Sequence, residues 1–183
     1  MNTQKLFILK TIAIVAGLLL FPACDKTPVE ETPEPEILIE GEVLVDGATV
    51  SRIESCFYSG YTPYPDTEVW QFEAFEKCYD DYRSAVKNGN RKLWYQYQSL
   101  DGGKNISEKI VLMGVDGHND LSVSWDNENI VPGSCVASVE TLEVKPSFSQ
   151  NKQYVDVELS LTTDNGEKVE VRLSGIALFD GRW

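Results

Sequence analysis

Most of the chain after residue 36 alternates between apolar and polar positions, which is the pattern of β-strands with one buried face. Two alternating runs at residues 155–173 flank the loop sequence Asp-Asn-Gly at 164–166. A three-residue loop there pairs Thr163 with Glu167 and places the apolar residues of both runs opposite one another. A two-residue turn would mix the two faces and oppose like charges. The pattern therefore predicts a hairpin with a bulge at Gly166.

The same alternation predicts six other strands, which makes eight in all. These six lie at residues 37–45, 48–58, 91–99, 109–115, 121–126 and 135–144. Asp46-Gly47 is a tight-turn signal that joins the first two strands as a hairpin. The apolar phase slips within the second strand, which predicts a bulge near Ser51 and Arg52.

Residues 67–88 follow another pattern, with apolar side chains at spacings of three and four, as on one face of a helix. The stripe consists of Trp70, Ala74, Phe75, Cys78, Tyr79, Tyr82, Ala85 and Val86. Asp66 or Thr67 can cap its first turn and Gly89 can end it, whereas Phe72 lies off the stripe. We therefore predict a mainly β (α+β) fold: an antiparallel β-sandwich or barrel-like domain of about eight strands with one amphipathic helix.

The first 24 residues have the composition of a secretory signal. A basic head is followed by an apolar run at residues 11–21, which is shorter than the about 20 residues that span a bilayer. Ala23 then precedes Cys24, and a cysteine after the boundary makes the segment resemble a bacterial lipoprotein signal. The resemblance implies that residues 1–23 are removed and that the Cys24 sulfur carries a diacylglycerol. The alternative is ordinary secretion, with Cys24 as a disulfide partner.

Residues 24–36 form the next segment, which is rich in proline and in acidic side chains. Such a sequence has little apolar surface to bury, so we expect an extended tether between the leader and a single domain at residues 37–183. The acidic residues after Cys24 resemble the surface-export signals of Bacteroides-type lipoproteins, which implies an outer-membrane or cell-surface location. In enteric-type bacteria, Asp25 would instead imply retention at the inner membrane.

The chain has a formal net charge of −13, and loss of the leader, with its two lysines and no acidic residue, would leave −15. A surface this acidic lacks the basic footprint of a nucleic-acid-binding protein. Anionic lipid surfaces would repel it, so a covalent anchor is a consistent way of holding it at a membrane. No phosphate-binding glycine loop or dinucleotide motif is present, and no cofactor is predicted.

Three cysteines remain once Cys24 is assigned to the lipid: Cys56, Cys78 and Cys135. An odd number allows at most one disulfide within the domain, and the spacings match no zinc pattern. Buried thiols are the alternative. If a disulfide forms, Cys56 and Cys78 are the expected pair, because one lies on the helical stripe and the other on a strand leading towards it.

Candidate ligand contacts lie at residues 58–66, which are expected to form a loop with three tyrosines and two prolines. Tyr58, Tyr61 and Tyr64 could stack on sugar rings or on a partner protein. The alternative is that these rings fold over the edge of the core.

Catalytic motifs are not recognisable. The single histidine, His118, lies in an oxygen-rich stretch at residues 114–120 that lacks the spacing of a calcium loop, so a turn is favoured and no metal site is predicted. No G-x-S-x-G motif surrounds a serine, and no pair among the 29 acidic residues stands out as an acid and a base.

A second resemblance covers about a third of the chain. The sequence IVPG at 130–133, together with residues 154–178, is similar to the C-terminal half of small uncharacterised lipoproteins of Bacteroides-type bacteria. It implies a β-sandwich or barrel-like domain at the cell surface and supplies no catalytic residues. The main hypothesis is a non-enzymatic, membrane-anchored binding or accessory protein for a glycan or another surface protein. The alternatives are a structural or assembly subunit of an envelope complex, and a hydrolase with a carboxylate pair that the sequence does not reveal.

Overall fold

A computed structural model describes residues 36–115, 117–127, 129–149 and 152–180 of the chain, which belong to one compact unit. Cys24 and the predicted leader lie outside these residues. The described strands are β1 (Ile39–Val45), β2 (Ala48–Ile53), β3 (Ser55–Tyr64), β4 (Thr67–Phe75), β5 (Arg91–Leu100), β6 (Asn105–Leu112), β7 (Leu121–Asp126), β8 (Asn129–Pro132), β9 (Val136–Val144), β10 (Ser147–Ser149), β11 (Lys152–Thr163) and β12 (Lys168–Phe179). The described helical elements are α2 (Tyr82–Asn88) and a short 3-10 turn, η1 (Asp101–Gly103). The predicted mainly β fold with one α-helix is confirmed.

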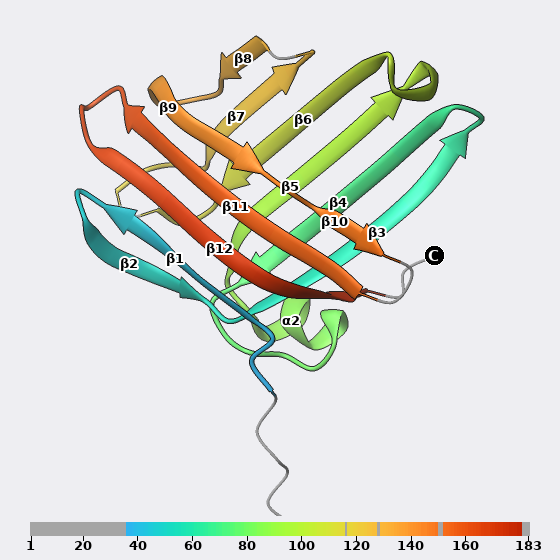
Figure 1. The fold of residues 1–183 in the computed structure, drawn as a ribbon. Coiled ribbons are helices and arrows are strands. Elements are labelled where there is room, and N and C mark those ends of the chain that lie inside the picture. Colours follow the sequence, from blue (N-terminus) through green and yellow to red (C-terminus); the bar gives the residue numbers. More distant parts are fainter. Residues whose placement is uncertain (1–35, 116, 128, 150–151, 181–183) are drawn as a thin grey trace, which may run out of the picture. The chain divides into compact units, whose positions relative to one another are not determined.

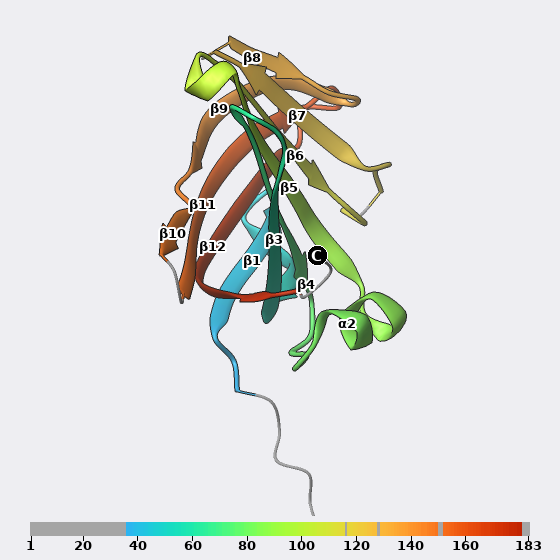
Figure 2. The same ribbon diagram turned by 90° about the vertical axis from the view of Figure 1, so that its right-hand side faces the viewer.

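The strands form one sheet that curls into two layers (Figure 1). In the front layer β12 lies between β11 and β1, β2 pairs with β1, and β9 and β10 pair with β11. The back layer runs from β3 to β8 in sequence order, with every neighbouring pair antiparallel. β12 and β3 connect the layers through a short parallel pairing that includes only Leu178–Phe57 and Phe179–Tyr58. Figure 2 shows the layers from the side, with α2 beside the back layer.

The core lies between the layers. Alternate residues of β11 and β12 point into it, as do alternate residues of β4 to β7, because side chains of a strand point to opposite faces in turn. Its members from β11 and β12 include Val155, Val157, Leu159, Leu161, Val169, Val171 and Leu173, and those from β4 to β7 include Phe72, Ala74, Leu93, Tyr95, Ile110, Leu112, Leu121 and Val123. Both layers therefore depend on the same buried apolar surface.

The β11–β12 hairpin has the predicted register. The Thr163 amide donates to the Glu167 carbonyl at 2.9 Å, and Leu161 lies opposite Val169. Gly166 has a φ of 86°, in the left-handed region that suits glycine. The predicted three-residue loop is confirmed. The register of the hairpin follows the pairing of apolar residues and not the geometry of a two-residue turn.

The helix predicted at residues 67–88 is wrong in its first half, which forms β4. Phe72, which lay off the helical stripe, is 2% exposed and packs in the core. The helix begins at Tyr82, after a cap in which the Asp81 carboxylate accepts from the Ser84 amide at 2.9 Å. The apparent helical spacing arose because β4 is buried on both faces: its outer face, with Val69 and Phe75, is buried as well as its inner face.

Three smaller expectations were also wrong. The described residues form twelve strands rather than eight. β3 continues to residue 64 through the expected tyrosine loop, and β6 begins at Asn105 rather than at residue 109. In contrast, the bulge expected in β2 near Ser51 and Arg52 is present and lies at Val50, because Val43 pairs with Ser51 and Leu44 with Thr49.

A second, smaller cluster holds α2 against the outer face of the back layer. Ala85 of the helix packs on Phe57 and Phe75, whose ring centroids are 6.0 Å apart. On the same face of β4, the Glu73 carboxylate accepts from the Tyr82 hydroxyl at 3.0 Å. The Arg91 Nε lies 2.7 Å from the Glu73 carboxylate. No helix in the described part of the chain is long and apolar enough to cross a membrane.

Candidate functional site

A cleft of about 440 Å³ opens beside the core, between β6, β7 and β8 of the back layer and β9 of the front layer. Its lining consists of Ile106, Glu108, Trp125, Asn127, Ile130 and Leu142. This volume lies within the range of small-molecule sites, which are about 300–1,000 Å³ and combine apolar walls with a few polar groups.

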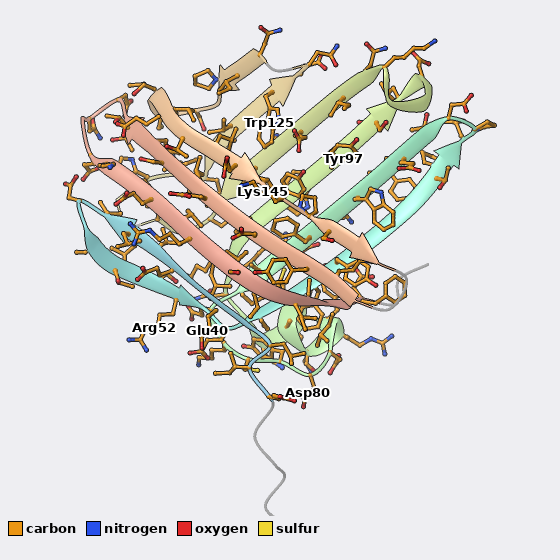
Figure 3. The ribbon with its side chains drawn as sticks, in the orientation of Figure 1. Glu40, Arg52, Asp80, Tyr97, Trp125 and Lys145 are labelled. Carbon is orange, nitrogen blue, oxygen red and sulfur yellow. The ribbon has the colours of Figure 1, made fainter. Side chains whose placement is uncertain are left out.

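The cleft lies at one end of a row of side chains that crosses the inner face of the back layer, and Glu108, Trp125 and Ile130 belong to both. Directly paired positions on β4, β5, β6, β7 and β8 form this inner row: Trp70, Tyr97, Glu108, Trp125 and Ile130. Paired residues share a face, so the row is continuous across five strands. Figure 3 labels Tyr97 and Trp125 on this layer. The inner row therefore presents three aromatic rings with one carboxylate in the middle.

Trp70 fits at one end of the inner row because its partner on β3 is a glycine. Gly60 lies opposite Trp70, and a Cβ atom at Gly60 would come within 2.1 Å of the indole ring. The indole thus lies across β3, in the space that a side chain at position 60 would occupy.

Glu108 is held in place by two donors. Its Oε1 accepts from the Tyr95 hydroxyl at 2.6 Å, and its Oε2 accepts from the Trp125 indole N–H. Tyr95 is fully buried, and burial, followed by the hydrogen bond to Glu108, raises the pKa of its hydroxyl. The Tyr95 hydroxyl therefore stays protonated and remains a donor to Glu108.

Sequence reasoning missed this site, although a signal was present. Ile106, Ile110 and Leu112 occupy the inner-face positions of β6, and Glu108 interrupts them. The strand had been predicted to begin at residue 109, after the glutamate. A single carboxylate at an otherwise apolar face is the type of residue that marks a functional position, because burying it is costly.

The three tyrosines proposed as ligand contacts do not form one surface. Tyr58 lies on the inner face, with its ring centroid 5.4 Å from that of Phe179. Tyr61 is on the opposite face of β3, since its neighbour Gly60 faces the inner row, and Tyr64 is 71% exposed at the hairpin tip. A role for any of them in binding stays a prediction.

The cysteines at 56, 78 and 135 are free thiols in the structure. Cys56 and Cys78 line the same small cavity, so the predicted pairing of these two stays a prediction. Burial, followed by the charge of Glu73, raises the pKa of the Cys56 thiol well above its usual value. This thiol is therefore a poor nucleophile as it stands.

His118 contacts a carboxylate instead of belonging to a cation site. Its Nε2 lies against Glu167, in the loop between β11 and β12. Among the described residues no group of three or more His, Cys, Asp or Glu side chains is placed to hold a metal ion. The contact joins the β6–β7 connection to the front layer and indicates a structural role.

A larger hollow of about 500 Å³ lies on the outside of the front layer, over β1, β2 and β12. Figure 3 labels Glu40 and Arg52 there. Glu42 is opposite both Arg52 and Arg172, and its carboxylate lies 3.8 Å from the Arg172 guanidinium. Since its charges face one another, this hollow has fewer groups available to a ligand than the inner row.

Comparison with known proteins gives no relative: no family model, no curated protein and no solved structure matches the chain.

Proposed function

We propose that this protein is a cell-envelope lipoprotein, anchored through Cys24, that binds a glycan along the inner row without hydrolysing it. The leader, which resembles a lipoprotein signal, and the acidic tether support the location. The observation that carries the proposed activity is the inner row itself, in which Trp70, Tyr97 and Trp125 flank one fixed carboxylate. That carboxylate and Trp125 also line the cleft.

The chemistry of the inner row suits a sugar chain. A sugar ring has apolar C–H faces, which stack on aromatic rings, and hydroxyl groups, which need acceptors and donors. Trp70 and Trp125 are three strands apart, and a strand spacing of about 4.8 Å puts their backbones roughly 14 Å apart, enough for a few sugar units. Glu108 and Asn127 supply polar groups beside the second indole.

Binding without hydrolysis is favoured by the number of carboxylates. Glycoside hydrolysis by the common mechanism uses two carboxyl groups about 5–9.5 Å apart on either side of the bond. Among the described residues that line the cleft, Glu108 is the carboxylate, and both of its oxygens accept hydrogen bonds from the protein. This arrangement suits an acceptor for ligand hydroxyls better than a general acid.

The proposed binding is tested with a glycan array, followed by calorimetry on the best ligand. We expect Trp125→Ala to weaken affinity by at least tenfold, because stacking on one ring contributes about 1–3 kcal/mol where bases stack on aromatic side chains. Trp94→Ala is the matched control: Trp94 lies on β5 next to Tyr95, so it points to the outer face. Equal losses for the two variants, or no glycan bound at all, would refute a glycan site in the inner row.

The proposed anchor is tested separately. The wild-type protein, expressed with its leader in a bacterium that lipidates such signals, should be recovered with membranes, because two or three acyl chains hold a protein durably on a bilayer. The variant Cys24→Ser should be released into the soluble fraction. Wild-type protein found wholly in the soluble fraction would contradict the anchor and leave the glycan site untouched.

A further inference from the structure

The carboxylate of Glu108 has no cationic partner in the part of the chain that the structure describes. The ion pairs found there involve other acidic residues, and the residues that line the cleft include no lysine or arginine. Glu108 is half-buried, and its two donors are neutral groups. Partly buried charges are costly unless they are paired, so the site has a negative charge that a ligand can neutralise.

Glu108 also retains free acceptor positions. An ionised carboxylate offers about four lone-pair sites, and the Tyr95 hydroxyl and the Trp125 indole occupy one on each oxygen. The remaining sites are available to donors that enter from the cleft, which Glu108 and Trp125 both line. Charge-assisted hydrogen bonds at these sites would be stronger than those made by a neutral hydroxyl group.

Aromatic rings flank the same position on both sides. Tyr97 and Trp125 are the direct partners of Glu108 on the neighbouring strands, and such pairs have Cβ atoms about 4.5–5.5 Å apart. A cation bound to Glu108 thus lies within reach of both side chains. Cations are attracted to aromatic faces within about 6 Å, most strongly to tryptophan.

We infer that the ligand carries a protonated amine, which binds Glu108 between Tyr97 and Trp125. The inference rests on the proposed function and narrows it: the glycan contains an amino sugar whose amino group is free, not acetylated. An acetylated sugar would leave the carboxylate without a counter-charge, and an anionic sugar would be repelled by it. Glu108 is then the residue that determines specificity.

Calorimetry with three probes tests the inference: glucosamine oligomers, their N-acetylated counterparts, and a simple alkyl diamine, all at slightly acidic pH and low salt. For the wild type we expect the free-amine oligomer to bind at least about tenfold more tightly than the acetylated one. Glu108→Gln should abolish this difference, since glutamine retains an acceptor for Tyr95 but lacks the charge. Glu40→Gln, on the outside of the front layer, removes the same charge elsewhere and should retain the difference.

Salt provides a second measurement that needs no variant. Ionic screening should weaken binding of the free-amine oligomer to the wild type and leave the acetylated oligomer nearly unaffected. Urea unfolding of Glu108→Gln checks that the variant is folded. If that variant does not fold, the salt series decides: equal salt dependence for both oligomers overturns the inference.

The remaining outcomes separate the inference from the proposed function. Equal affinity for both oligomers, unchanged in Glu108→Gln, overturns the amine inference and leaves glycan binding standing. A diamine that binds as tightly as the free-amine oligomer, and depends on Glu108, supports recognition of the amine but contradicts a glycan ligand. If neither oligomer binds but another glycan does, the amine inference is refuted and the proposed glycan binding is retained.

Discussion

Glu73 lies on the outer face of β4, beneath α2, with its side chain only 5% exposed. The Tyr82 hydroxyl donates to it at 3.0 Å, and the Arg91 Nε lies 2.7 Å away. The buried carboxylate therefore joins the helix to β4 and to β5. Removing one member of such a cluster leaves the others without their acceptor.

We expect Glu73→Ala to lower the free energy of unfolding by about 2–4 kcal/mol, less than for a fully buried pair because the Arg91 side chain is 34% exposed. Glu76→Ala is the control: its carboxylate lies 3.3 Å from the Lys92 ammonium, but the Glu76 side chain is 30% exposed, and ion pairs of exposed carboxylates contribute about 0–1 kcal/mol. Urea unfolding measures both. Similar losses for the two variants would mean that burial of Glu73 does not matter.

Single residues were the hardest features to predict from the sequence. Glu108 carries the proposed specificity, yet it is one of 29 acidic residues and no motif surrounds it. Its importance depends on which face of β6 it occupies and on its pairing with Tyr97 and Trp125. Tyrosines 58, 61 and 64 were noticed because they are close in sequence, but alternation along β3 separates Tyr58 from Tyr61.

At the scale of elements, strands with one exposed face were predictable and strands with two covered faces were not. Residues such as Asp156 and Glu158 on β11 face solvent, so the period of two is clear and even the register was correct. β4 is covered by the core on one face and is buried on the other, beside α2. Its polar positions are therefore too few to show the period, and a helical spacing appeared by coincidence.

The β11–β12 loop allows a test at this scale. Gly166 has a positive φ, which a β-branched residue adopts poorly, whereas Asn165 does not. We expect Gly166→Val to lower the free energy of unfolding by about 1–2 kcal/mol and Asn165→Ala by less than about 0.5 kcal/mol. Thermal unfolding of both variants measures the difference. The reverse order would contradict a bulge that depends on Gly166.

At the scale of the described domain, the two layers are joined by a small contact between β12 and β3. Leu178 and Phe179 pair with Phe57 and Tyr58, and the Asp180 amide donates to the Tyr58 carbonyl at 3.0 Å. Leu178 also packs against the cluster beneath α2. These residues couple the outer cluster to the main core.

Ending the chain after Ala177 should lower the free energy of unfolding by about 2 kcal/mol or more, because it exposes apolar surface of both clusters. It should also broaden the unfolding transition, since the two layers would lose a shared element. Ending the chain after Asp180 retains both strand pairs and serves as the control. A sharp, unshifted transition for the shorter chain would show that this contact does not couple the layers.

The position of β12 in the sequence has a consequence for how the chain matures. β12 is the last strand described, yet it pairs with β1 and β3 near the start of the domain as well as with β11. While the protein is being synthesised, β1 and β3 therefore lack one neighbour until β12 leaves the ribosome. Contacts between such distant segments form slowly. The two layers therefore cannot complete their shared core until β12 has been synthesised, so folding of the described domain waits for this one strand.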